Sequence, residues 1–217
     1  MAQVPEPPKR LRIEQDMDEG LHWLSRQHGM FDKALQETGG VQLRLRPGGF
    51  SALISMIVHQ QVSLAAAASI LKRVKAGVRP MTPERVLELS VDELRACGLS
   101  RPKIKSLHDM SDMLATGQVK LNGLHHKDDD TVRAALVSLP GIGPWTAEVY
   151  LLSCLGRPDA FPDNDVGLQE SVRLLTGDRP STKELAAMAE DWRPWRGVAA
   201  RVLWTYINHV RSKDYQS

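Results

Sequence analysis

Apolar residues recur at helical spacing along almost the entire sequence, and this periodicity limits the possible folds more than any other feature. Alternation typical of a strand occurs only weakly, at Val41–Arg46. Capping residues mark several helix starts: Thr82 precedes Pro83, and Ser90 precedes Glu93 by three residues. The pattern predicts an all-α protein with helices at residues 17–27, 49–60, 63–75, 83–89, 91–97, 101–115, 129–138, 144–155, 166–175, 182–191 and 195–210.

Length, charge and cysteine content narrow the classes of protein that this chain can represent. A chain of 217 residues can form one sizeable core or two small ones that share it. With 28 Lys+Arg against 26 Asp+Glu, any nucleic-acid-binding face has to come from local clustering of charge. The two cysteines, Cys97 and Cys154, are too few for an iron–sulfur cluster or a structural zinc site. We therefore expect no metal site, no cofactor and a reducing compartment.

The N-terminal residues 1–16 are rich in proline and basic side chains at their start, which predicts a disordered tail. They lack the apolar core of a signal peptide, and no stretch of the sequence is long and apolar enough to span a bilayer. We expect an intracellular monomer, located in the cytoplasm and bacterial nucleoid or, in a eukaryote, in the nucleus.

The most informative segment is Leu139–Ala147, with the sequence LPGIGPWTA, between two predicted helices. Gly141 and Gly143 can adopt positive φ and let the backbone approach a ligand, and Ile142 is the apolar plug between the helices. The N–H groups of the helix that starts at Pro144 can bind an anion such as a DNA phosphate. An ordinary glycine-rich turn between two helices is the alternative interpretation.

This segment resembles the hairpin of the helix-hairpin-helix base-excision DNA glycosylases, the HhH-GPD superfamily. The resemblance continues through Phe161–Gln169, Trp192–Arg196 and the Q-Q-x-S segment at Gln60–Ser63, from about residue 50 to about residue 205. It is closest to the 3-methyladenine DNA glycosylase II type, in a compact form without the extra N-terminal sheet domain of larger members. The family fold implies two lobes with the active-site cleft between them. Lobe 1 would comprise about 17–48 plus 160–217, and lobe 2 about 49–159 with the hairpin 139–147.

The resemblance implies that Asp165 is the catalytic aspartate, which stabilises an oxocarbenium-like transition state while the glycosidic bond of a flipped, alkylated purine is hydrolysed. The residues alone predict that Asp165 caps the helix at 166–175, and the two roles are compatible because negative charge is favoured at a helix N-terminus. Asp163, two residues earlier, is the competing candidate but lies outside the family register.

Two tryptophans are candidates for the pocket that receives the base. Trp145 lies in the register where bifunctional relatives carry a Schiff-base lysine, so a monofunctional enzyme without a lyase step is expected. Trp204 lies opposite the apolar stripe of its helix, beside Arg201 and Asn208, and could stack on a cationic base. The alternative for both tryptophans is packing against a neighbouring helix.

The remaining candidates contact double-stranded DNA that contains a damaged base. The resemblance implies that Gln61 fills the gap left by the flipped base; the plain alternative is that Ser63 caps a helix and the glutamines are solvated. A hairpin of this kind can also bind a monovalent cation through its backbone. A non-enzymatic helix-hairpin-helix DNA-binding module and a glycosylase for other damaged bases remain the rival functions. The predicted DNA contacts are Gln60, Gln61, Ser63, Gly141, Ile142, Gly143 and Thr146.

Overall fold

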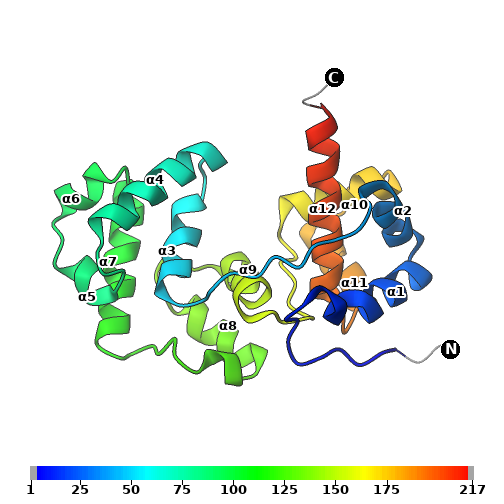
Figure 1. Ribbon diagram of the computed structural model, residues 1–217, viewed down its shortest axis with the longest axis horizontal. Coiled ribbons are helices and arrows are strands. Elements are labelled where there is room, and N and C mark those ends of the chain that lie inside the picture. The colour runs from blue at the N-terminus through cyan, green and yellow to red at the C-terminus, as the bar shows by residue number, and fades with distance from the viewer. Residues whose placement is uncertain (1–3, 215–217) are drawn as a thin grey trace. The chain divides into compact units, whose positions relative to one another are not determined.

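The computed structural model describes residues 4–214, and within that range every regular element is a helix (Figure 1). This confirms the predicted all-α class, and the weak alternation at Val41–Arg46 forms no strand. The elements are η1 Glu14–Met17, α1 Asp18–Gln27, α2 Gly29–Thr38, α3 Phe50–His59, α4 Leu64–Gly77, α5 Pro83–Leu87, α6 Val91–Ala96, α7 Arg101–Ala115, η2 Leu124–His126, α8 Asp129–Val137, α9 Pro144–Leu155, α10 Val166–Thr176, α11 Thr182–Glu190 and α12 Arg196–Asp214.

The chain divides into two compact units. Unit 1 contains the residues up to Leu45 together with those from Leu151 onward, and unit 2 is Arg46–Tyr150. The sequence placed these boundaries near residues 48 and 159. The second boundary falls earlier because the last turn of α9 packs into unit 1, where Leu151 and Leu152 are fully buried.

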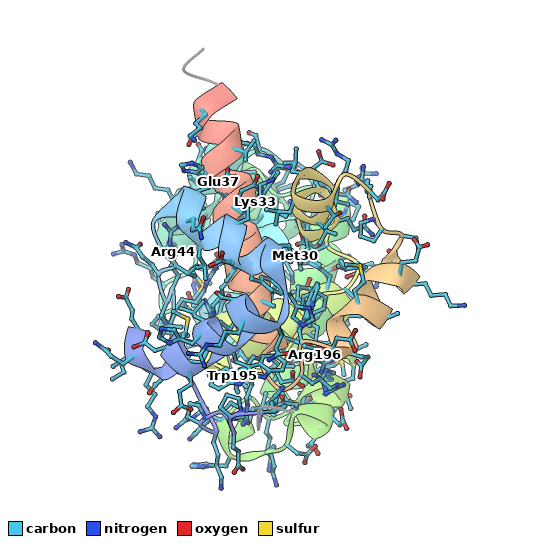
Figure 2. The ribbon with its side chains drawn as sticks, turned by 90° about the vertical axis from the view of Figure 1, so that its right-hand side faces the viewer. Met30, Lys33, Glu37, Arg44, Trp195 and Arg196 are labelled. Atoms are coloured by element: carbon cyan, nitrogen blue, oxygen red, sulfur yellow. The ribbon has the colours of Figure 1, made fainter. Side chains whose placement is uncertain are left out.

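Helix α12 is the central element of unit 1, with α1, α2 and α10 packed against it (Figure 1). The predicted apolar stripe is confirmed, since Val198, Val202 and Leu203 are completely buried. Trp195, just before α12, packs against α1 so closely that a Cβ at Gly20 would lie 2.3 Å from its ring (Figure 2). Glycine is therefore required at position 20 for the two elements to meet.

Helix α2 is absent from the sequence prediction. It begins after His28, whose side chain makes no capping hydrogen bond, so the usual start signal is missing. The stop signal is present, because Gly39 adopts φ 74° and ends the helix in the left-handed conformation. Lys33 and Glu37 lie on the exposed side of α2 (Figure 2), whereas Phe31 and Ala34 are buried. The helix is thus stabilised by tertiary burial of one face.

The predicted disordered tail is wrong for residues 4–16, which lie against unit 1. Leu11 is 1% exposed, and its N–H donates to the carbonyl of Gly156 at 2.7 Å. The indole N–H of Trp195 donates to the carbonyl of Pro5 at 3.1 Å. A single apolar anchor and two backbone contacts are enough to order a proline-rich segment, which has little conformational entropy to lose.

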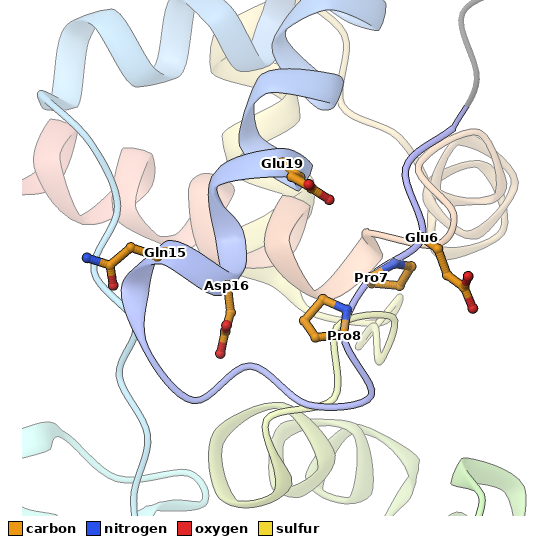
Figure 3. A pocket seen from close by; sticks show the side chains of 6 residues that line it. All are labelled: Glu6, Pro7, Pro8, Gln15, Asp16 and Glu19. Atoms are coloured by element: carbon orange, nitrogen blue, oxygen red, sulfur yellow. The ribbon is translucent and has the colours of Figure 1, made fainter.

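This N-terminal arm also lines a cavity of about 460 Å³ (Figure 3). Glu6, Pro7 and Pro8 of the arm face residues of η1 and the start of α1 across it. The carboxylates of Glu6, Asp16 and Glu19 give the cavity an acidic lining, which does not suit an anionic ligand such as DNA.

Unit 2 is built around α3 and α7. Helix α3 is buried on most sides, including Leu53, Ile54 and Ile57, and it packs on α4 and α7. Helix α7 packs in addition on α5 and α6, and it buries Leu107 and Met110. The predicted helix starts are confirmed, because the hydroxyls of Thr82 and Ser90 accept hydrogen bonds from backbone N–H groups three residues later; Ser181 in unit 1 does the same.

Candidate active site

Asp165 is the N-cap of α10, as the sequence predicts. One carboxylate oxygen accepts a hydrogen bond from the N–H of Leu168 at 2.9 Å, and the N–H of Asp165 donates to the carbonyl of Pro162 at 3.0 Å. The side chain is half-buried, whereas that of Asp163 is exposed. The first turn of α10 therefore holds one carboxylate of this loop in a defined position, with the positive end of the helix dipole beside it.

Trp204 of α12 lies at the same end of α10. A Cβ placed on Gly167 would lie 3.0 Å from the Oδ1 atom of Asp165 and 3.9 Å from the Cδ1 atom of Trp204. The fold thus brings together an aspartate and a tryptophan that are far apart in the sequence. Trp204 is half-buried, so it is not enclosed by the core of unit 1.

Two groups hold this arrangement in place: Ser171, which the sequence did not single out, and the aromatic residues of two motif segments, whose packing role it did not predict. The buried hydroxyl of Ser171 lies 2.7 Å from the carbonyl of Leu203 and fastens α10 to α12 one residue before Trp204. The loop before Asp165 is anchored by Phe161, whose ring lies 5.6 Å from that of Trp192 in an edge-on arrangement. Trp192 packs in turn on Phe31 at 5.2 Å. A buried serine carries no functional signature in the sequence, and a motif does not say which aromatic residue its own aromatics will contact.

Arg201 corrects the predicted polar face of α12. The sequence placed it on the polar face of the helix beside Trp204, but it is 6% exposed. Its guanidinium donates to the carbonyl of Leu152 at 2.7 Å and to that of Arg44 at 3.4 Å. Burial lowers the pKa of Arg201 to about 10. The helix is surrounded by other segments here, so helical periodicity does not identify a solvent-facing side.

The hairpin of unit 2 is present, although its two glycines differ. Gly141 has φ 84°, and a Cβ there would lie 2.8 Å from the Cβ of Ser106 on α7, so glycine is required for folding. Gly143 does not adopt the positive φ that glycine allows. It precedes α9, and its carbonyl accepts a hydrogen bond from the N–H of Ala147 at 3.0 Å. A Cβ on Gly143 would meet no protein atom within 4 Å. The backbone is therefore open to a ligand at Gly143.

Two predicted DNA contacts of the hairpin point into the protein. Ile142 is 4% exposed, which confirms the apolar plug and excludes its side chain as a DNA contact. Thr146 is 3% exposed, so the predicted contact of this residue with DNA would have to use its backbone. Helical spacing turns Thr146 inward together with the buried Ala147. Trp145 is half-buried at the start of α9, and its role as a pocket residue stays a prediction.

The loop that joins α3 to α4, residues 60–63, is built from the predicted Q-Q-x-S segment. The hydroxyl of Ser63 accepts from the N–H of Ala66 at 3.2 Å and caps α4. The carboxamide of Gln60 donates to the carbonyl of Gly141 at 3.0 Å, so this glutamine is not simply solvated. Gln61 is exposed and has φ 56°, a left-handed conformation that is uncommon for any residue but glycine.

Two exposed apolar side chains follow Gln61 in the chain, although the sequence analysis considered only the glutamines. Val62 is 37% exposed and Leu64 is 80% exposed. An exposed apolar group next to a left-handed residue is the kind of feature that can enter a base stack. The role of Gln61 in filling the DNA helix stays a prediction, and Val62 and Leu64 are further exposed side chains in this region.

No described residue belongs to a group of three or more acidic, cysteine or histidine side chains that could hold a metal ion. Among the described helices, none has the length and apolarity required to cross a membrane.

An all-helical fold with a glycine hairpin, and an aspartate capping a helix beside a tryptophan, defines a class of DNA-repair protein. Residues 54–196 match the family model described as HhH-GPD superfamily base excision DNA repair protein. The chain belongs to the HhH-GPD superfamily, as the sequence motifs indicated.

Individual members of the family show which of its proteins this chain is similar to. The chain is 32% identical over 182 residues to a putative DNA-3-methyladenine glycosylase, YfjP, of Bacillus subtilis; the match covers 79% of this chain and 63% of the relative. It is 44% identical over 82 residues to a probable bifunctional transcriptional activator/DNA repair enzyme AlkA of Mycobacterium tuberculosis, covering 38% of this chain and 16% of the relative. The chain therefore spans less than two thirds of the length of these curated relatives.

Solved structures match over more of their length. The 3-methyladenine DNA glycosylase of Schizosaccharomyces pombe, in complex with abasic DNA, superposes with a TM-score of 0.78 at 25% identity; the match covers 86% of this chain and 95% of that one. A DNA-3-methyladenine glycosidase from Bacillus halodurans gives a TM-score of 0.77 at 30% identity, with 90% and 93% covered. The helical fold of this chain is thus that of known HhH-GPD glycosylases.

Proposed function

We propose that the protein is a DNA glycosylase that excises alkylated purines, of the 3-methyladenine and 7-methylguanine type, from double-stranded DNA. The observation that carries this proposal is the placement of both Asp165 and Trp204 next to Gly167 at the start of α10. A module that only binds DNA needs neither a positioned carboxylate nor an indole beside it. The relatives named for 3-methyladenine support the substrate class.

In the proposed reaction, Asp165 supplies charge stabilisation. An alkylated purine carries positive charge and leaves without being protonated first, so the remaining barrier is the oxocarbenium-like sugar. A carboxylate about 4 Å from a developing unit charge contributes roughly 4 kcal/mol at an effective dielectric constant of ~20. That energy corresponds to about three powers of ten in rate, which is adequate for an already labile bond.

Trp204 would receive the flipped base. Its indole is electron-rich and stacks favourably on a cationic ring, whereas a neutral normal purine gains only the stacking part of that interaction. The hydrogen bond from Ser171 to Leu203 keeps this part of α12 in register with the start of α10. The pair therefore combines recognition of positive charge on the base with stabilisation of positive charge on the sugar.

Binding to the duplex would come from unit 2. The open backbone at Gly143 and the N–H groups of the first turn of α9 bind a phosphate, and the exposed loop 60–63 occupies the space that the flipped base leaves. Trp145 lies where a Schiff-base lysine would be needed, so the enzyme hydrolyses the base and stops, leaving an intact abasic strand. We propose that it acts as a monomer, wherever cellular DNA is present.

The test is incubation of the purified protein with randomly methylated duplex DNA, followed by chromatographic identification of the released bases. Release of 3-methyladenine and 7-methylguanine is expected. Binding without release of any base would favour the non-enzymatic module and contradict the proposal. Release of oxidised bases alone, from an oxidised duplex run in parallel, would assign a different glycosylase activity.

A further inference from the structure

Lys103, in the first turn of α7, has its ammonium group directed at the end of another helix. Its Nζ atom donates to the carbonyl of Val58 at 2.7 Å and to the carbonyl of Gln60 at 2.9 Å. Both carbonyls lie at the C-terminal end of α3, where the last carbonyls of a helix have no partner within it. The lysine therefore caps α3 from a separate element, at the negative end of its dipole.

The side chain of Gln60 forms a second hydrogen bond that holds the same loop. While the Gln60 carbonyl accepts from Lys103, its carboxamide donates to the carbonyl of Gly141 in the hairpin at 3.0 Å. Ser106 lies one turn after Lys103 on α7. A Cβ built on Gly141 would lie 2.8 Å from the Cβ of Ser106, so the two residues are in close contact. Helix α7 thus contacts both the loop 60–63 and the hairpin through residues of one face.

The next residue shows why this support matters. Gln61 adopts φ 56°, which an L-residue with a side chain adopts only when its surroundings impose it. No other described residue except glycine has a positive φ. Gln61, Val62 and Leu64 are exposed, so they make few contacts that could hold this conformation. Hydrogen bonds hold the backbone on both sides of Gln61: those of Lys103 to Val58 and Gln60 before it, and the Ser63 cap of α4 after it.

We propose that Lys103 is a positioning residue that locks the loop 60–63 in the conformation required to fill the DNA helix when the damaged base is flipped. The inference rests on the proposed function and adds to it a residue that positions the loop 60–63. The rival assignment for a lysine at the start of a helix in a DNA-binding protein is direct contact with a phosphate. The structure favours positioning, because two of the three N–H donors of the ammonium are used on carbonyls of the α3 end and the group is partly buried, which lowers the pKa of Lys103.

The experiment compares Lys103→Met with Lys120→Met, which makes the same chemical change at an exposed position of unit 2. Single-turnover excision is measured on one methylated purine in two settings, fully paired and opposite a mismatched base. A mismatched base costs less to unpair, so filling the helix matters less for it. Lys103→Met should lose roughly tenfold or more in maximal rate on the paired lesion and recover most of that loss on the mismatched one. Lys120→Met should match the wild type, and Lys103→Arg, which keeps a cationic donor, should restore rate toward it.

Two readouts do not depend on excision. The salt dependence of binding to undamaged duplex should keep its slope in Lys103→Met, whereas loss of a phosphate contact lowers the slope by about one. Amide hydrogen exchange at Gln61 and Val62 should become faster in Lys103→Met, with protection of α7 unchanged. Should Lys103→Met fail to fold, Gln60→Ala removes the second fastening and should show the same dependence on pairing.

Equal rate loss on paired and mismatched lesions, a salt slope reduced by about one, or loop exchange identical to the wild type would each overturn the assignment. Failure of the proposed function gives a different result. In that case the wild-type protein releases no base from either substrate, while exchange and binding still report on the loop.

Discussion

At the residue scale, the structural role of Asp165 and the catalytic role proposed for it depend on the same carboxylate position. Its carboxylate accepts a hydrogen bond from the N–H of Leu168, which is the ordinary arrangement of an N-cap. That position also places a negative charge at the start of α10, beside Trp204. A structural and a catalytic role for this carboxylate therefore require no separate geometry.

The first prediction separates those two roles. Asp165→Asn should keep the fold, because asparagine is as good an N-cap as aspartate. Base release should fall by roughly two orders of magnitude or more, since the charge is lost while the shape remains. Single-turnover excision and a thermal melt of the same preparation measure both quantities. Near wild-type excision by the variant would transfer the catalytic assignment to Asp163.

The second prediction concerns Trp204. Trp204→Ala should raise the transition-state free energy for excision of a methylated purine by about 1–3 kcal/mol, the contribution of one base–aromatic stack. Trp204→Phe should recover part of the loss, because a smaller ring keeps stacking but attracts a cation less strongly. The measurement is single-turnover excision corrected for the folded fraction. A large fall in melting temperature with activity per folded molecule intact would make Trp204 a packing residue.

At the scale of elements, the two glycines of the hairpin differ in what a side chain would meet. The third prediction compares Gly143→Ala with Gly141→Ala. Gly143→Ala should leave the melting temperature nearly unchanged, because its Cβ meets no protein atom, yet weaken binding to all DNA sequences alike. Gly141→Ala should destabilise the protein, because it combines positive φ with a clash against Ser106. Sequence-dependent weakening in Gly143→Ala would argue against a phosphate-binding hairpin.

The fourth prediction concerns acid stability. The N–H and hydroxyl of Ser181 lower the pKa of Glu184 below its ordinary value of 4.5 in the capping box of α11. A carboxyl whose pKa is lower in the folded state stabilises the protein above its unfolded pKa, and that stabilisation is lost as pH falls through the folded pKa. Glu184→Gln should therefore melt below the wild type at pH 7, with the gap closing under more acidic conditions. Melting curves across pH 7 to about 2 test this. A gap that is constant across this range would show that the charge contributes nothing.

At the scale of the whole molecule, two compact units are built from one chain that passes between them twice, before Arg46 and within α9. The first unit carries Asp165 and Trp204, whereas the second carries the hairpin and the loop 60–63. Each set of residues is already assembled inside its own unit. The proposed activity requires both, one for the chemistry and one for binding the duplex.

The fifth prediction concerns the absence of an amine at the position of Trp145. Borohydride added during turnover should trap no covalent protein–DNA adduct, because a Schiff base requires an amine and Trp145 occupies that register. The product should be an intact abasic strand on a denaturing gel. A bifunctional family member run beside it provides the positive control. A stable adduct would contradict the monofunctional assignment.

The sequence predicted most helices, their caps and the candidate aspartate, because those features depend on neighbours within a few residues. Periodicity, an N-cap or a glycine at a helix end is a local property, readable from the chain itself. Helix α2 was missed for the same reason, since His28 provides no capping bond and burial of Phe31 stabilises the helix. The N-terminal arm was predicted to be disordered because its partner is far along the chain: the N–H of Leu11 donates to the carbonyl of Gly156.

The sequence by itself determined the all-helical class, the hairpin motif and the identity of Asp165 as the candidate catalytic residue. Only the tertiary structure decided that Trp204 lies beside Asp165, that Arg201 is buried, and that Lys103 caps a helix other than its own. These contacts join segments far apart in the chain, so no periodicity or spacing encodes them. They depend on which surfaces become buried when the helices pack, and that selection is made by the whole molecule.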